Sequence, residues 1–149
     1  MLKAASQGDI ETIKMYLEQG VDINYRNSGI LYSQETACMK AAEKGQLEVL
    51  KFLIENGADY KRANDGGENP ISYAGKNGQF EVVMYLISIG EDVNYQEKNY
   101  GMTPLLNAAQ YGTIEYMKQL ISKGADKKIR NKEKHTLLTI ASSLKKQML

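Results

Sequence analysis

Apolar side chains recur at spacings of three and four residues in three segments of the chain. The sets are Leu47, Leu50, Leu53 and Ile54; Phe80, Val83, Leu86 and Ile87; and Ile114, Met117, Leu120 and Ile121. This spacing places the apolar groups on one face of an α-helix. Shorter segments that end in glycine precede these helices, so the pattern predicts helix pairs. Helices of about ten residues are too short to be stable alone in water, and they must pack on their neighbours.

Two series of glycines keep the same phase along the chain. The first contains Gly8, Gly45, Gly78 and Gly112, and the second follows it by 12 residues at Gly20, Gly57, Gly90 and Gly124. Glycine ends a helix well because it accepts the left-handed backbone required there. The two series mark four units, and the chain continues into an abbreviated fifth; we place the five at 1–24, 25–60, 61–94, 95–126 and 127–149.

The start of the first helix in a unit is marked as well. Thr103-Pro104 and Asn69-Pro70 each combine a capping side chain with a proline. The Thr or Asn oxygen accepts a hydrogen bond from a free backbone N–H, and proline lacks the N–H that would remain unpaired at the next position.

The motifs Thr103-Pro104-Leu105-x-x-Ala108-Ala109-x-x-Gly112 and Leu120-Ile121-x-x-Gly124-Ala125-Asp126 resemble the ankyrin repeat family, and the resemblance covers essentially the whole chain. It implies an all-α solenoid of paired antiparallel helices in about five units. Hairpin-like loops would project to one side and form a concave face with the first helices.

The chain departs from the family pattern in its histidines. The histidine that follows Thr-Pro-Leu in the family is replaced in every unit, by Leu2, Met39, Ser72, Leu106 and Thr139. The loop hydrogen bonds of that histidine must therefore be remade or lost, and we expect a lower stability than in an idealised array.

Unit two has about four extra residues in its loop, within 26–34, and they include Ile30, Leu31 and Tyr32. Two interpretations remain open: local packing of the longer loop, or an exposed anchor for a partner.

The two end units are also irregular. Unit one begins inside its first helix and resembles an N-terminal capping repeat. In unit five Lys145 stands where glycine should end the helix, which predicts a single longer helix to about Gln147. We expect Leu138, Ala141, Leu144 and Met148 to pack on unit four. This unit is either a natural cap or the end of a fragment.

The composition is that of a globular protein, and its net charge is too small to produce a strong electrostatic field. Hydrophobic residues make up 42%, charged residues 25%, and the net charge is +1. The longest apolar run, 82–89, is too short to cross a bilayer, and the first residues lack a signal-peptide pattern. With a single cysteine, Cys38, we expect a cytoplasmic protein that does not enter membranes.

No pattern in the sequence points to catalysis. It has no phosphate-binding loop, dinucleotide fingerprint or paired metal-ligand motif. Cys38 takes the leucine place of Thr-Pro-Leu, so we expect a buried structural thiol. His135, the one histidine, fits a hairpin surface. We therefore expect no enzyme, no metal and no cofactor.

Unit five is strongly basic, with seven Lys and Arg residues against one Glu. One interpretation is a polar outer surface that keeps the terminal repeat in solution. The other is a site for a nucleic acid or another anionic ligand, with Lys127, Lys128, Arg130 and Lys132 as candidates. No aromatic residue interleaves with these positions, which disfavours stacking on single-stranded bases.

The family resemblance implies that another protein binds the hairpin tips and the two residues before the first glycine of each unit. The candidates are Tyr32, Glu35, Glu43, Lys44, Asp65, Glu68, Lys76, Asn77, Asn99, Tyr100, Met102, Gln110 and Tyr111. We hypothesise that Tyr100 and Tyr111, with Met102, form the centre, because tyrosine is favoured at interface hot spots. The alternative is that they pack between hairpins. We expect a monomer, with self-association through the last unit left open.

The glycine assignment can be tested at Gly112. Replacing it with a β-branched residue such as valine should lower the free energy of unfolding by roughly 1–2 kcal/mol, because a left-handed backbone penalises a Cβ atom. Thermal melting measures this change. An unaltered melting temperature would show that the helix does not end there.

Overall fold

Nine short α-helices and their connecting loops form the part of the chain that the computed structural model describes, residues 1–28, 34–111 and 113–147. The helices are α1 (Leu2–Gln7), α2 (Ile10–Glu18), α3 (Ala37–Glu43), α4 (Leu47–Glu55), α5 (Pro70–Lys76), α6 (Phe80–Ser88), α7 (Pro104–Gln110), α8 (Ile114–Ser122) and α9 (Leu137–Gln147). No strand occurs in these ranges. The predicted all-α class is therefore confirmed.

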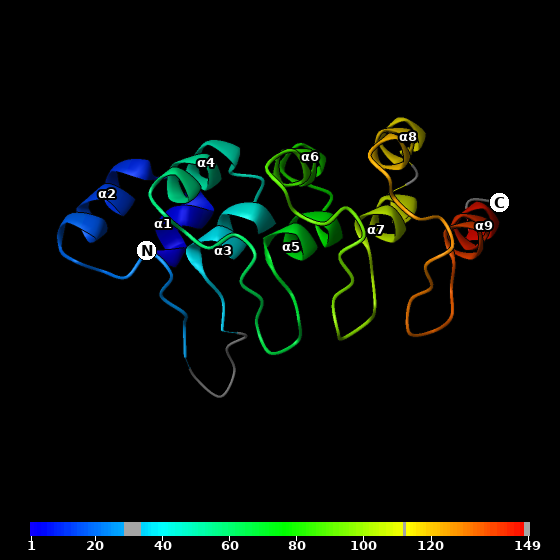
Figure 1. The fold of residues 1–149 in the computed structure, drawn as a ribbon, viewed down its shortest axis with the longest axis horizontal. Helices are drawn as coiled ribbons and strands as arrows, with labels where there is room; N and C mark the ends of the chain where they lie inside the picture. Colours follow the sequence, from blue (N-terminus) through cyan, green and yellow to red (C-terminus); the bar gives the residue numbers. More distant parts are fainter. Residues whose placement is uncertain (29–33, 112, 148–149) are drawn as a thin grey trace.

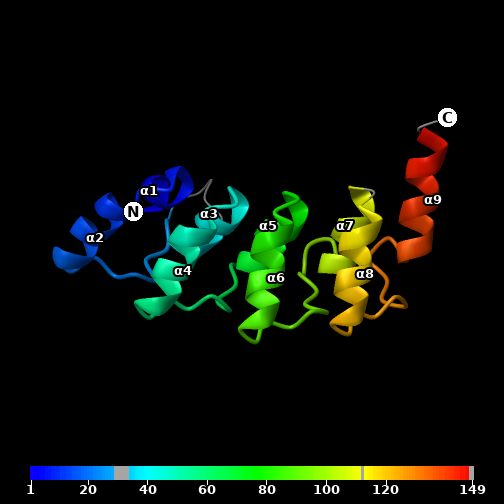
Figure 2. The ribbon, with the colours of Figure 1, turned by 90° about the horizontal axis from the view of Figure 1, so that it is seen from above.

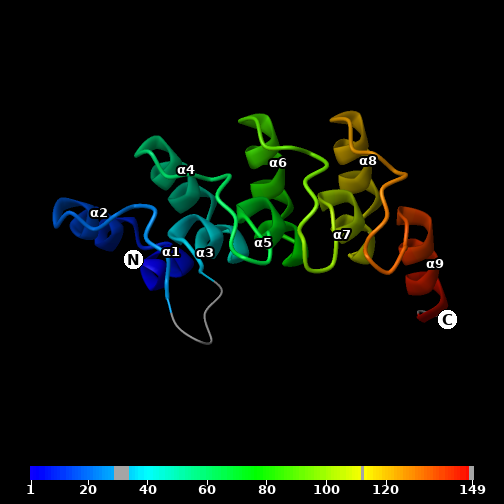
Figure 3. The same ribbon diagram turned by 60° about the horizontal axis from the view of Figure 1, so that its bottom comes forward.

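The helices form two parallel rows. α1, α3, α5, α7 and α9 form an inner row, and α2, α4, α6 and α8 form an outer row above it (Figure 1). Long loops leave the inner row on the side away from the outer helices (Figure 3). Seen from above, successive pairs lie side by side from the N-terminal to the C-terminal end (Figure 2). This arrangement is the predicted solenoid with loops on one side.

The signals that begin and end the helices act as predicted. Asn69 accepts a hydrogen bond from Ser72 N at 3.2 Å, and Thr103 accepts one from Leu106 N at 3.2 Å. The glycines of the first series that the structure describes have φ between 69° and 79°, in the left-handed region. Gly112 lies outside the described residues.

The core is a continuous apolar layer between the two rows. Leu50, Leu53, Val83, Leu86 and Leu120 are fully buried, as the helical spacing predicts. The outer helices α6 and α8 also touch directly through stacked aromatic rings. The buried residues of this layer come from units one to four, so each helix pair contributes to the burial of the next.

The prediction that Ile114 lies on the buried apolar face of α8 was wrong, because this residue is 65% exposed. The equivalent residue of α6, Phe80, stacks on Tyr116 of α8 with ring centroids 4.1 Å apart. Within the described residues no outer helix follows α8, so Ile114 has no such neighbour.

The single helix predicted for unit five is confirmed, with α9 ending at Gln147. The predicted packing face was wrong in part, because Leu138 is 75% exposed. The half-buried side is formed by Leu137, Ile140, Ala141 and Leu144. The helix begins at Leu137, and spacings of three, four and seven from that residue share a face. Met148 lies outside the described residues.

Each loop is closed at its base by one hydrogen bond between backbone groups. Asn64 N donates to Glu68 O at 2.8 Å, and Asn131 N donates to His135 O at 3.0 Å. The same asparagines make a second hydrogen bond across the loop: their side-chain oxygens accept hydrogen bonds from the backbone N–H groups of Glu68 and His135. Asparagine side chains therefore supply loop bonds in units two, three and five, which lack the family histidine.

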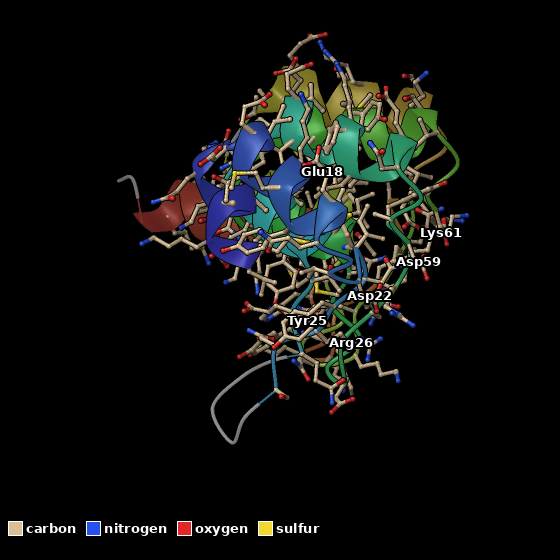
Figure 4. The ribbon with its side chains drawn as sticks, turned by 90° about the vertical axis from the view of Figure 1, so that its left-hand side faces the viewer. Glu18, Asp22, Tyr25, Arg26, Asp59 and Lys61 are labelled. Atoms are coloured by element: carbon tan, nitrogen blue, oxygen red, sulfur yellow. The ribbon has the colours of Figure 1, made fainter. Side chains whose placement is uncertain are left out.

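Neighbouring loops are also joined to each other. Lys98 N donates to Gly66 O at 3.0 Å, and Lys132 N donates to Tyr100 O at 2.9 Å. At the N-terminal end Arg26 reaches the next loop and donates to Ala63 O. Figure 4 looks at this end, where Asp22 and Arg26 lie on the first loop. The extra residues Ile30, Leu31 and Tyr32 lie outside the described residues.

Cys38 is buried in α3, as predicted for a structural thiol. Burial, with the negative charge of Asp59 as a lesser cause, raises the pKa of its thiol to about 12. The thiol is therefore protonated at neutral pH and makes a poor nucleophile.

Glu91 is a buried carboxyl at a position where two other units have Ala58 and Ala125. It accepts hydrogen bonds from Asp92 N at 2.9 Å and from the Asn69 side chain at 3.3 Å. Burial outweighs these bonds and raises the pKa of Glu91. Because the folded protein holds the ionised form less well than the unfolded chain does, Glu91 lowers stability at neutral pH.

Replacing Glu91 with glutamine should raise the free energy of unfolding at pH 7. In wild type, the contribution of Glu91 to stability falls as pH rises from its unfolded pKa, near 4.5, through its higher folded pKa. The advantage of the variant should therefore vanish below about pH 4, where the carboxyl is protonated in both states. Urea unfolding between pH 4 and pH 8 measures this difference, with the exposed Glu81→Gln as control. A gain that does not change with pH would contradict the assignment.

Candidate functional site

The described candidate partner-binding residues lie in the C-terminal parts of the inner helices and in the loops that precede these helices. Figure 3 shows these loops projecting beside the inner row. The C-terminal ends of α5 and α7 and the loops before α7 and α9 line a common cavity on this side. In units two and three, several described candidates form ion pairs with one another or with Lys40. In unit four, most of the described candidates line a cavity instead.

In unit two the candidates Glu35 and Glu43 are bonded to Lys40, which lies between them. Lys40 Nζ is 2.8 Å from Glu35 Oε1 and 3.1 Å from Glu43 Oε2. Tyr73 of α5 donates its hydroxyl to Glu35 at 3.2 Å. Burial alone would raise the pKa of Glu35, but the bonds from Lys40, Asn27 and Tyr73, with the Lys40 charge, lower it. Glu35 therefore holds a loop to two helices.

In unit three a glutamate before the helix cap again pairs with a lysine of the inner helix. Lys76 Nζ is 2.5 Å from Glu68 Oε1 and 4.2 Å from the centre of the Tyr73 ring. Burial, with nearby glutamates as lesser causes, raises the pKa of Tyr73, so its hydroxyl stays protonated as a donor. The charges of the candidates Glu68 and Lys76 are thus paired with each other.

Unit four lacks this network. Met102 precedes the helix cap where units two and three have Glu35 and Glu68, and Asn107 occupies the place of Lys40 and Tyr73. A cavity of about 480 Å³ opens here, lined by Lys76, Asn99, Tyr100, Met102, Asn107, Gln110, Asn131, Lys132 and Glu133. A smaller cavity of about 80 Å³ adjoins it. The candidates Lys76, Asn99, Tyr100, Met102 and Gln110 therefore come together, along with Lys132 from the basic set.

Glu97 holds the loop that carries Tyr100. Its buried carboxylate accepts hydrogen bonds from the backbone N–H groups of Asn99 at 2.6 Å, Tyr100 at 2.9 Å and Met102 at 3.0 Å. The Tyr100 side chain itself is 71% exposed. A fixed backbone thus presents a free aromatic ring beside the cavity. We did not identify Glu97 from the sequence, although it stands where the other loops have asparagine.

Tyr111 does not line the cavity. Its hydroxyl donates to Lys76 O, and its ring meets the edge of Phe80 with centroids 5.7 Å apart. In the preceding unit Gln79 makes the equivalent bond, donating to Glu43 O at 3.2 Å. Thr113 follows the glycine of unit four where Gln79 follows Gly78, and its side chain is shorter. Tyr111 therefore joins two units.

The other candidates are spread along the same side. Lys44 is exposed, Asn77 donates to Tyr73 O at 2.8 Å, and Asp65 accepts from Gln34 at 2.9 Å. Tyr32 lies outside the described residues. The basic candidates Lys127, Lys128, Arg130 and Lys132 are all exposed, and none has an ion pair with another described residue.

Membrane-spanning helices and metal-binding clusters are both absent from the described residues. No helix there is long and apolar enough to cross a membrane. No group of three or more His, Cys, Asp or Glu side chains in the same ranges is placed to hold a metal ion.

Comparison with known proteins matches part of the chain to three much longer relatives. It is 32% identical over 81 residues to the rat ankyrin repeat and SAM domain-containing protein 6, and 35% identical over 79 residues to the palmitoyltransferase AKR1 of Lachancea kluyveri. It is 37% identical over 73 residues to the human 2-5A-dependent ribonuclease. These matches cover 54%, 53% and 47% of this chain, but only 9%, 11% and 10% of the relatives.

The family comparison agrees with the helix pairs and loops. A model of three ankyrin repeats matches residues 1–97, and a model of one ankyrin repeat matches residues 100–129. Together the matches extend over the four helix pairs α1–α2 to α7–α8. The chain belongs to the ankyrin repeat family.

Proposed function

We propose that this chain is a non-catalytic scaffold that binds another protein through its concave face and loop tips. The observation that carries the proposal is the pairing of an exposed aromatic ring, Tyr100, with a cavity of about 480 Å³ on that face. Hot spots in protein interfaces combine a large amphipathic side chain with a pocket that excludes water.

The rigidity of this loop supports the proposal. Glu97 fixes the backbone on one side of Tyr100, and Lys132 N bonds to Tyr100 O on the other. A preformed loop loses little conformational entropy when a partner binds, so more of the contact energy contributes to affinity.

The relatives support a binding scaffold over a shared reaction. Two of them are enzymes by name, with different activities, and each match covers only about a tenth of the relative. A module that recurs beside different activities fits recognition. We further propose that the chain acts in the cytoplasm as a monomer, in line with its buried, reduced Cys38.

Replacing Tyr100 with alanine should weaken binding of the partner by about 1–3 kcal/mol. The side chain makes no hydrogen bond with the described residues, so thermal stability should not change. The partner can be captured from native cytosol with the wild-type protein and identified, and its affinity for both forms measured by calorimetry. Equal affinities would exclude Tyr100 from the interface.

Replacing Tyr111 with alanine should lower the stability of the fold and leave the contact with the partner intact. It removes a hydrogen bond between units and an edge-to-face ring contact, so the free energy of unfolding should fall by about 1–3 kcal/mol. Urea unfolding measures this change, and Tyr111→Phe, which keeps the ring, should lose less. If Tyr111→Ala keeps full stability but loses the partner, Tyr111 belongs to the interface and not to the joint between units.

A further inference from the structure

Asn107 is a buried polar side chain whose hydrogen-bonding groups are unused. Only 5% of the residue is exposed, yet its carboxamide makes no hydrogen bond with any residue that the structure describes. Its amide atoms are not among the enclosed side-chain atoms that lack a partner, so they face the open space of the cavities and not the protein interior. Asn107 lines both the large and the small cavity, so its free groups are open to a ligand there.

The structure of α5 leaves room for this side chain. Gly75 stands where unit four has Ala109 and unit two has Ala42. A Cβ atom on Gly75 would lie 2.9 Å from Asn107 Nδ2, closer than side chains normally approach. The glycine of one unit and the asparagine of the next therefore fit together.

Units two and three show what closes this position elsewhere. Where Asn107 stands, Lys40 and Tyr73 are both bonded to Glu35. Met102 cannot accept the same charge-assisted bond, and its sulfur is 3.7 Å from Asn131 Nδ2. The opening in unit four therefore coincides with two differences, Met102 in place of a glutamate and Asn107 in place of the longer Lys40 and Tyr73.

The chemistry of the lining selects the ligand. Carboxamides carry a donor and an acceptor, the same pair that an extended peptide main chain offers. Asn107 and Gln110 provide such groups, while Met102 and Tyr100 provide apolar contact. The charges nearly cancel, because Glu68 pairs with Lys76 and the rim carries Lys132 beside Glu133. A neutral, amide-bearing wall favours a peptide over an anion.

We propose that this cavity binds an extended peptide segment of the partner. The Asn107 carboxamide hydrogen bonds to the peptide main chain, and one aliphatic side chain of the peptide packs on Met102 beside Tyr100. The volume is at the lower end of the range for ligand pockets, which suits one side chain with its flanking main chain. The inference rests on the proposed function and specifies the form of its partner.

The test uses a phage-displayed library of random seven-residue peptides, selected on the whole chain. Counter-selection uses the double variant Met102→Glu/Asn107→Lys, which copies the Glu35–Lys40 pair of unit two and should close the cavity. We expect the enriched peptides to share an aliphatic residue at a fixed position. Their affinity should fall at least tenfold on the double variant, whose fold is checked by circular dichroism and melting.

Two further measurements isolate the main-chain contact. Asn107→Ala should weaken an enriched peptide about tenfold, corresponding to the loss of one hydrogen bond, while Lys44→Ala, outside the cavity, should not. Methylating the peptide backbone N–H groups one at a time should identify one position whose methylation weakens binding to wild type. The same methylation should have little further effect on Asn107→Ala.

Two results would overturn the inference: no peptides enriched over the double variant, or enriched peptides that bind wild type and Asn107→Ala equally. Failure of the proposed function can be distinguished from failure of the peptide inference. If the cytosolic partner still depends on Tyr100 while no peptide is enriched, the face binds a folded surface and the scaffold proposal stands. If peptides bind through Asn107 but the partner ignores Tyr100, the cavity is real and the assigned interface is wrong.

Discussion

No helix pair in this chain can bury its apolar side alone, and the stacking of one pair on the next is the contact on which the rest depends. The inner helices are six or seven residues long before α9, too short to persist in water without neighbours. Stacking provides their burial, and the joints are then fixed by directed bonds. Gln79 and Tyr111 each reach back to a carbonyl of the preceding inner helix.

A regular scaffold makes its irregular positions informative. Equivalent residues meet equivalent neighbours, so a change in one unit can be compared with the same place in the others. Glu35 and Glu68 hold one such position and each pairs with a lysine of the inner helix that follows it, whereas Met102 holds the same position in unit four and lines the cavity. The internal comparison therefore separates residues that serve the fold from residues that are free to contact something else.

The sequence predicted what depends on local chemistry. Glycines in phase, capping side chains and apolar spacing determine where helices begin, end and face the core, and the helices follow them. It failed where the outcome depends on a distant neighbour. Ile114 fits the apolar spacing, but its exposure follows from the absence of a further outer helix in the described residues. Tyr111 could not be assigned to a joint, because its acceptor lies 35 residues away on Lys76. Glu97 was missed since its bonds are to backbone groups, which leave no mark on the sequence.

The abbreviated fifth unit gives the array an uneven distribution of stability. No α9 side chain that the structure describes is fully buried, and within the described residues no outer helix packs over it. In a one-dimensional array a unit with so little burial opens more readily than its better-buried neighbours. Yet this unit supplies Asn131 and Lys132 to the cavity and donates the bond that fixes Tyr100. Opening of this unit therefore dismantles one wall of the cavity, and a bound segment holds the unit closed. Occupancy and the order of this unit are linked, so a ligand stabilises a unit that opens readily without it.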